Sequence, residues 1–155
     1  MPWAERHTPA VYRAMRRATS RRAAAGAALP FAIRYDGRLV GQVTVDNVVR
    51  GALRSGHLGY WVDSTVAGRG VTSLAVALVC DHAFGPVGLH RLQADIRPEN
   101  TPSRRLVERL GFRQEALFRD YLDIDGAWRD HLGYALLAGE LPGGVLARWR
   151  ARHPA

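Results

Sequence analysis

The sequence predicts a mixed α+β fold, in which helices flank one central sheet. Three observations lead to this prediction. Apolar residues recur at helical spacing within 70–84, they alternate along 89–96, and two Asp-Gly pairs separate runs that are typical of strands. The 155 residues are enough to bury a core, and no repeat or linker divides them, so we expect one domain over 1–155.

Capping and turn signals then place each element. Thr8 and Pro9 are typical of a helix start and Gly26 of a helix end, while Asp36-Gly37 and Asp125-Gly126 are typical of two-residue hairpin turns. The expected elements are a helix at 9–25, strands at 31–35 and 39–45 (the second possible as far as 49), a loop at 51–56, a strand at 57–62, a helix at about 70–84, a strand at 89–96, a helix at 101–110, strands at 113–124 and 127–136, and a helix at 143–152.

The helix expected at 70–84 also bears on the compartment. Asp81 and His82 interrupt it, so it is no membrane span, and the opening residues 1–7 lead into no apolar stretch of the kind that signal peptides have. The single cysteine, Cys80, cannot form an internal disulfide, and we interpret it as a small core residue in a reducing cytoplasm. The apolar stripe of this helix consists of Val71, Leu74, Ala75, Leu78 and Val79.

The chain contains 22 arginines and no lysine, and its formal net charge is +8. Without lysine, Schiff-base enzymes, pyridoxal enzymes and P-loop NTPases are excluded, because each needs a lysine amine. Arginine forks bind phosphate oxygens in pairs, so the basic surface favours coenzyme phosphates or ribosomal RNA as partners. Solvated arginine faces are the alternative. The clusters lie at 16–17, 21–22, 104–105 and 148–152.

A glycine-rich loop between the strand at 57–62 and the helix that follows is the strongest local signal. Such a turn leaves backbone N–H groups unpaired at the positive end of a helix dipole, which suits a phosphate or pyrophosphate. We therefore expect a nucleotide-containing ligand. The residues expected to form this cradle are Gly68, Arg69, Gly70, Val71, Thr72 and Ser73.

The loop and three later segments resemble the GCN5-related N-acetyltransferase (GNAT) superfamily. In its pattern Gln/Arg-x-x-Gly-x-Gly/Ala, Gly70 stands at the fourth position, while Ala67 and Thr72 depart from the first and sixth. Three further segments are similar to the Rim-type branch, the ribosomal-protein alanine N-acetyltransferases. They are residues 97–103, Leu110-Gly111-Phe112 and the run Asp-Gly-Ala-Trp-Arg-Asp-His at 125–131. Residues 47–51 also resemble that branch. The resemblance covers 40–140, with only Pro2-Trp3 before it, and implies a GNAT domain shortened at its N-terminus.

The resemblance implies transfer of an acetyl group from acetyl-CoA to a primary amine, most simply a protein N-terminal alanine or serine. Trp61 and Val62 would lie on a strand that splays from its neighbour beside the pantetheine arm, with the Val62 N–H as the oxyanion donor. Asn100 would contact the pantetheine, or it is only a helix cap. Ser103 would protonate the leaving thiolate. Candidates for the coenzyme phosphates are Arg104, Arg105 and Arg109.

The general base and the acceptor site are less defined. Asp123 is a candidate catalytic acid–base residue on the final hairpin, with Asp120, Asp130 and His131 as other candidates and a water chain as the alternative. The hairpin 121–131 and the loop 46–56 are expected to wall the amine slot through Asn47, Arg50 and Trp128. The six histidines lack ligand spacing, so we expect no metal. A small amine such as a polyamine or aminoglycoside is the alternative acceptor, and an inactive acyl-CoA-binding or ribosome-associated module the alternative function. The chain could act as a monomer or a homodimer.

Overall fold

The structure, a computed structural model, describes residues 8–153. The expectations for residues 1–7 and for Pro2-Trp3 lie outside the described residues. The predicted α+β fold is confirmed, and most elements end within a few residues of their predicted bounds. The elements are α2 (Pro9–Ala24), β1 (Leu29–Tyr35), β2 (Arg38–Val49), β3 (Ser55–Val62), a short 3-10 helix (Ser64–Val66), α3 (Val71–Phe84), β4 (Arg91–Ile96), α4 (Thr101–Leu110), β5 (Arg113–Ile124), β6 (Ala127–Leu137) and α5 (Gly144–Ala151).

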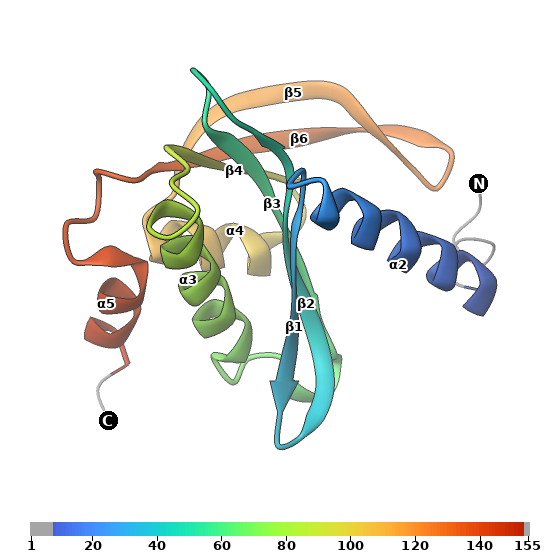
Figure 1. Cartoon of the computed structure of the whole chain (residues 1–155), viewed down its shortest axis with the longest axis horizontal. Coiled ribbons are helices and arrows are strands. Elements are labelled where there is room, and N and C mark those ends of the chain that lie inside the picture. Colours follow the sequence, from blue (N-terminus) through green and yellow to red (C-terminus); the bar gives the residue numbers. More distant parts are fainter. Residues whose placement is uncertain (1–7, 154–155) are drawn as a thin grey trace.

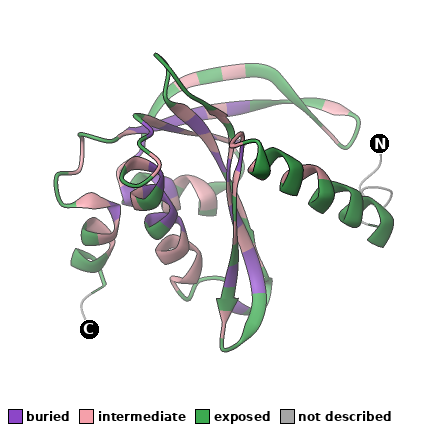
Figure 2. Ribbon diagram, viewed as in Figure 1, coloured by how far each residue is buried: buried purple, intermediate pink, exposed green. Residues whose placement is uncertain are grey.

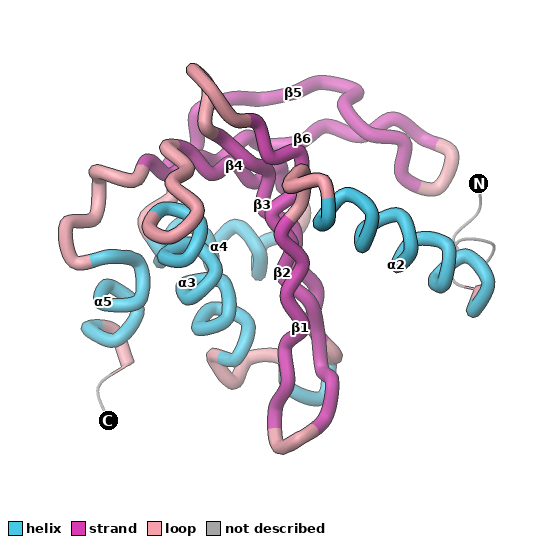
Figure 3. The backbone as a smooth tube through the Cα atoms, in the orientation of Figure 1, coloured by secondary structure: helices cyan, strands magenta, loops and turns pink. Residues whose placement is uncertain are grey.

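The six strands form one mixed sheet in the order β1-β2-β3-β4-β6-β5 (Figure 3). β3 and β4 are the parallel neighbours, and the other pairs are antiparallel. β3 and β4 are paired only over Ser55–His57 and Arg91–Gln93, after which the two strands part. The sheet therefore opens between its two halves at the C-terminal end of β3.

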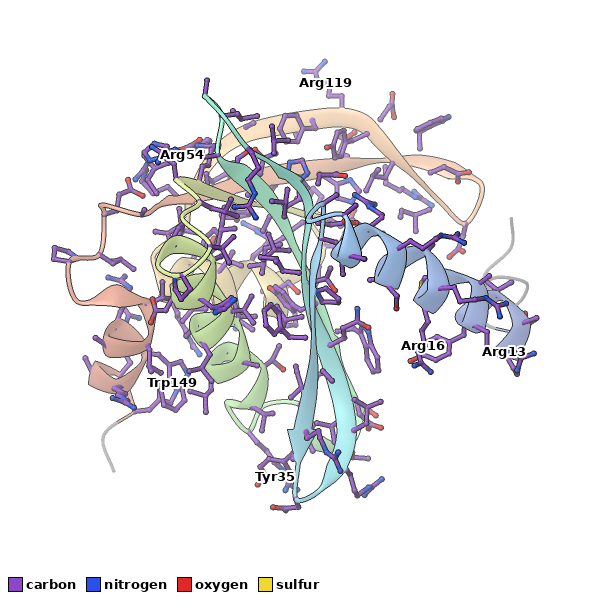
Figure 4. The ribbon with its side chains drawn as sticks, viewed as in Figure 1. Arg13, Arg16, Tyr35, Arg54, Arg119 and Trp149 are labelled. Carbon is purple, nitrogen blue, oxygen red and sulfur yellow. The ribbon has the colours of Figure 1, made fainter. Side chains whose placement is uncertain are left out.

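Helices cover the two faces of the sheet unequally. α3, α4 and α5 lie on one side of β1–β3, and α2 lies on the other (Figure 1). The buried residues gather in the sheet and in α3, whereas α2 buries no residue (Figure 2). Arg13 and Arg16 project from α2 away from the sheet (Figure 4). Within residues 8–153, no helix is long and apolar enough to cross a membrane.

Both predicted hairpin turns are confirmed by their backbone conformation. Asp36 and Gly37 have φ of 48° and 75°, and Asp125 and Gly126 have φ of 55° and 80°. Two consecutive residues with positive φ match the twist of a two-residue hairpin, and Asp-Gly tolerates that conformation well. Thr8 also caps α2 as expected, because its side chain accepts a hydrogen bond from the Val11 N–H at 3.3 Å.

The predicted apolar stripe of α3 was partly wrong. Leu78 is 49% exposed, and the face in the core is rotated toward Val76, Val79, Cys80 and Ala83. The helix is apolar around most of its circumference, so helical spacing alone could not select the buried side. Cys80 is fully buried, as predicted for a core residue, and burial raises the pKa of its thiol.

Candidate active site

The loop between β3 and α3 has the geometry of an anion cradle. Gly68 and Gly70 both have φ of +77°, a left-handed conformation that side chains with a Cβ rarely adopt. Gly70 is the N-cap residue of α3, and no side chain caps this helix. The N–H groups of the first turn therefore point outward without a side-chain acceptor, at the positive end of the helix dipole.

The edge of β3 beside this loop is free where the sheet opens. Beyond His57 its backbone has no β4 partner, while β2 pairs with its other edge as far as Val62. Tyr60 spans the opening, because its hydroxyl donates to the backbone carbonyl of Ser103 on α4 at 3.3 Å. Burial raises the pKa of Tyr60 to about 12, so this phenol stays protonated at neutral pH.

A groove of about 670 Å³ joins the free strand edge, the glycine loop, α4 and the end of α5. The lining contains arginines and a histidine but no aspartate or glutamate among the described residues, so the groove favours an anion. Its lining residues are Tyr60, Trp61, Val62, Ala67, Gly68, Gly70, Thr72, Ser73, Asn100, Thr101, Pro102, Ser103, Arg105, Leu106, Arg109, Leu110, Trp149, Arg152 and His153.

The start of α4 brings two predicted residues into this groove. The Asn100 side chain accepts a hydrogen bond from the Ser103 N–H at 3.3 Å, so Asn100 acts as the helix cap. The cap orients Ser103, whose side chain lines the groove beside Tyr60. The predicted contact of Asn100 with pantetheine and the predicted proton transfer from Ser103 stay predictions.

A second cavity, of about 430 Å³, lies on the opposite face of the sheet between α2, β2 and β3. It shares Tyr60 and Trp61 with the groove, so the two spaces border the same free part of β3. Asp46 is the only carboxylate among its described lining residues, and an Arg22 nitrogen lies 2.8 Å from it. The cavity is lined by Met15, Ala18, Thr19, Arg22, Gln42, Thr44, Asp46, Gly59, Tyr60 and Trp61.

Not all of the residues predicted to bind the coenzyme phosphates line the groove. Arg104 does not line the groove, because its guanidinium donates to the Tyr134 hydroxyl at 3.2 Å and to the Pro98 carbonyl at 3.0 Å. Arg105 and Arg109, on the outer side of α4, line the groove instead. Val71 packs against the core, and Arg69 is exposed. Ser73 lines the groove and donates to the Gly70 carbonyl at 2.9 Å.

The structure does not bring the predicted acceptor residues together. Asn47 binds Arg22 and His57, Arg50 donates to the Val87 carbonyl, and Trp128 is 64% exposed near the hairpin tip. Asn47 has a φ of 48° at an irregularity where β2 slips in register against β3, which redirects the residues after it. α2, rather than the hairpin 121–131, forms the wall of the second cavity opposite the sheet.

Asp123 has a structural partner that its sequence position did not reveal. Its carboxylate accepts the Gly126 N–H at 2.8 Å and so stabilises the hairpin turn. It lines neither the groove nor the second cavity. The pairing of β5 with β6 shifts in register between Phe118 and Leu122, so alternation along the strand does not predict which way Asp123 faces.

The groove wall formed by α5 was missed by the sequence reasoning. Trp149, Arg152 and His153 line the groove, although they follow the glycine loop by about eighty residues in a chain of 155. The arginine cluster at 148–152 was the one available signal. Within the described residues, no group of three His, Cys, Asp or Glu side chains gathers as a metal site would require.

Comparisons with known proteins agree on one family. The acetyltransferase (GNAT) domain family matches residues 1–113. Mycobacterium smegmatis RimJ in complex with CoA-disulfide superposes with a TM-score of 0.92 and 46% identity, covering 98% of this chain and 73% of that chain.

Two curated proteins are also similar. The "Probable N-acetyltransferase YjcK" of Bacillus subtilis is 40% identical over 66% of this chain and 56% of its own length. The ribosomal protein uS5-alanine N-acetyltransferase of Escherichia coli is 37% identical over 63% of this chain and 50% of its own length. The chain thus spans about half the length of these curated relatives. Because the family match extends over 113 of the 155 residues, the chain belongs to the GNAT acetyltransferase domain family.

Proposed function

We propose that this protein is an N-acetyltransferase that moves an acetyl group from acetyl-CoA to the N-terminal amine of a protein. The observation that carries the proposal is that two cavities, one on each face of the sheet, share the lining residues Tyr60 and Trp61, where β3 has parted from β4. One cavity is basic and ends at a glycine cradle, as a coenzyme with phosphates requires. The other opens on the opposite face, where an amine can approach the same strand.

The coenzyme would lie along the free edge of β3. The N–H groups of the loop and of the first turn of α3 would bind its pyrophosphate, and the unpaired backbone of Tyr60–Val62 would bind the pantetheine amides. The Val62 N–H would then stabilise the oxyanion that forms when the amine attacks the thioester carbon. A β2 partner fixes this part of the strand on its other edge, so the donor is oriented before the coenzyme arrives.

Ser103 is our candidate for the proton donor to the departing thiolate. It lies at the groove beside Tyr60, and the cap by Asn100 fixes the turn that carries it. Tyr60 acts as a positioning residue, since its hydroxyl is already committed to the Ser103 carbonyl. Loss of the proton from the amine needs no buried base, because an N-terminal amine has a pKa of about 8 and is partly neutral at physiological pH.

An extended peptide end suits the second cavity better than a polycation does. The described lining offers one carboxylate, Asp46, and that group already pairs with Arg22. A polyamine or an aminoglycoside would need several convergent acids. The similarity to the uS5-alanine enzyme favours a small first residue, so we propose alanine or serine at the N-terminus of a ribosomal protein as the acceptor.

The test is the rate of CoA release from acetyl-CoA with matched acceptors. We expect peptides that begin with Ala or Ser to react faster than peptides with a blocked N-terminus, spermidine or kanamycin. A preference for spermidine or kanamycin would replace the acceptor assignment and leave the coenzyme assignment intact. Acetyl-CoA binding without turnover on any acceptor would instead identify an inactive acyl-CoA-binding module.

A further inference from the structure

Helix α2 carries an arginine-rich face that the proposed reaction does not use. The 16 residues of α2 contain five arginines and no aspartate or glutamate. One of them, Arg22, faces the sheet, where it pairs with Asp46 and binds Asn47. The other four are exposed, and we call them the arginine face of α2: Arg13, Arg16, Arg17 and Arg21.

The arginine face points away from the rest of the protein. Met15 and Arg22 line the second cavity, which identifies the inner side of the helix. At 3.6 residues per turn, the four arginines lie on the outer side, and Figure 4 shows Arg13 and Arg16 projecting away from the sheet. From Arg13 to Arg21 the helix rises by about 12 Å. The positive charges therefore form a row along the surface.

The charge of this row is not neutralised within the part of the chain that the structure describes. The ion pairs among residues 8–153 include Arg22 of α2 but no member of the arginine face. Arg17 lies four residues from both Arg13 and Arg21, a spacing at which like charges repel and destabilise a helix. α2 buries no residue that would offset this repulsion. A polyanion lying along the row would remove the repulsion and stabilise α2.

The arrangement of α2 favours a phosphate backbone over a lipid bilayer. A helix that binds a bilayer surface inserts an apolar side between the lipids. In α2 the larger apolar residues Val11 and Met15 lie one turn apart on the inner side, whereas Ala14 and Ser20 are among the small residues that flank the arginines. The outer side therefore offers charge without an apolar surface to insert, and guanidinium groups bind phosphate oxygens in pairs.

Tyr12 favours nucleic acid over an acidic protein. Its side chain is 41% exposed, and it precedes Arg16 by one helical turn at the border of the arginine face. An exposed aromatic ring beside a row of guanidinium groups can stack on an unpaired base while the arginines bind the backbone. An acidic polypeptide has no base to place on this ring.

The arginine face and the groove lie on opposite sides of the sheet. α2 lies on one side of β1–β3, and α3, α4 and α5 lie on the other (Figure 1). A nucleic acid on α2 would therefore not compete with a coenzyme in the groove. The inner side of the same helix lines the second cavity, where we propose that the acceptor amine binds. A ligand on the arginine face would thus lie beside the acceptor.

We propose that the arginine face of α2, with Tyr12 at its border, is a docking surface for RNA with unpaired bases. The docked RNA holds the enzyme next to the protein whose N-terminus enters the second cavity. The choice of RNA as the nucleic acid rests on the proposed function, because a ribosomal protein meets its enzyme among ribosomal RNA.

The test is fluorescence anisotropy of a labelled single-stranded RNA of about 20 nucleotides, titrated with the protein at several salt concentrations. Replacing the four arginines of the face by Ala should lower the RNA affinity about tenfold or more. It should also make the slope of log K against log salt shallower by about 3, since each lost phosphate contact removes about 0.7. Alanine favours the helix, so the variant should fold. The matched control removes the same charge from exposed arginines on other elements: Arg38, Arg54, Arg119 and Arg150.

Two further measurements locate the RNA. Tyr12→Ala should lower the RNA affinity about fivefold or more and leave the affinity for heparin, a polyanion without bases, unchanged. A saturating concentration of CoA should not displace the RNA. Displacement by CoA would place the RNA in the groove and overturn the proposal.

The remaining outcomes separate this inference from the proposed function. An equal loss of RNA affinity in the control variant would indicate a general effect of charge and overturn the docking surface. Tighter binding to phosphatidylserine vesicles or to polyglutamate than to RNA would overturn it in favour of a membrane or an acidic protein. The variant that lacks the arginine face should acetylate a free peptide at an unchanged rate. RNA binding by a protein that acetylates no peptide would overturn the proposed function and leave the docking surface standing.

Discussion

The cap that Asp81 places on α5 predicts a large effect from a single substitution. α5 begins after Gly143, which offers no side chain to cap it, and Asp81 from α3 accepts the first N–H groups in its place. Asp81→Ala removes an N-cap, worth about 1 kcal/mol, together with a second charge-assisted hydrogen bond and a favourable helix-dipole contact, worth about 1–2 kcal/mol more. We expect the free energy of unfolding to fall by about 2–3 kcal/mol.

Equilibrium unfolding in guanidinium chloride measures this change, with an unaltered m-value as the sign that only stability has changed. The melting temperature should fall by about 4–12 °C, as expected for a domain of this size. The free energy of unfolding of Asp81→Asn should lie between those of Asp81→Ala and the unmodified protein, since one oxygen still accepts a hydrogen bond but the charge is lost. Asp63→Ala is the control. Asp63 also caps a backbone N–H, at Thr65, but it is exposed and serves only a three-residue helix.

A loss below about 0.5 kcal/mol in Asp81→Ala, or a loss no larger than that in Asp63→Ala, would refute the reasoning. The former would mean that water replaces the carboxylate at little cost. Because α5 carries Trp149 and Arg152, the same variant should also bind CoA more weakly. A destabilised protein with unchanged CoA affinity would mean that α5 contributes nothing to coenzyme binding.

Three further predictions concern the groove. Gly70→Val should abolish the rise in melting temperature that acetyl-CoA causes, because a branched side chain at φ +77° obstructs the cradle. Gly37→Val imposes similar strain at φ +75° on a remote turn and should preserve that rise. Ser103→Ala should lower kcat by about 10²-fold with CoA affinity unchanged, whereas equal rates would leave Ser103 without a proton-donor role. For Tyr60, the pKa is raised to about 12 in the folded state, so its stabilising contribution is complete below pH 10 and is lost as the pH rises from about 10 to 12. This loss of about 3 kcal/mol in the free energy of unfolding should be missing in Tyr60→Phe. Denaturant unfolding between about pH 9 and pH 12 measures it, and an equal dependence of the free energy of unfolding on pH in the two proteins would contradict the prediction.

The local sequence predicted the backbone well at positions where few residue types can adopt the required conformation. Asp36-Gly37 and Asp125-Gly126 adopt the positive φ values that two-residue turns require, and few other residue pairs would do so at low cost. Gly70 likewise stands at the left-handed position that opens α3. Such positions constrain the backbone directly, so their conformation is encoded within two or three residues.

Long-range contacts decided what the sequence could not predict. The buried face of α3 depends on where β1–β3 and α5 lie, because apolar residues surround the helix almost evenly. Arg104 looked equivalent to Arg105 in the sequence, yet Tyr134 and Pro98 draw it away from the groove. Asp46 was not predicted either, since its role depends on α2, whose Arg22 pairs with it in the second cavity.

The side-chain chemistry of this protein would suit the reactive thioester that the proposed function assigns to it. Thioesters acylate amines and thiolates, and proteins that bind them risk modification of their own surface. This chain has no lysine, and guanidinium groups such as those of its arginines are poor nucleophiles. Its single thiol is fully buried, with a raised pKa that suppresses the thiolate. The protein therefore lacks the two side chains that thioesters acylate most readily, an amine and an accessible thiol, and mass spectrometry of an acetylation mixture should find acetylation on the N-terminal amine of the acceptor and none on Cys80.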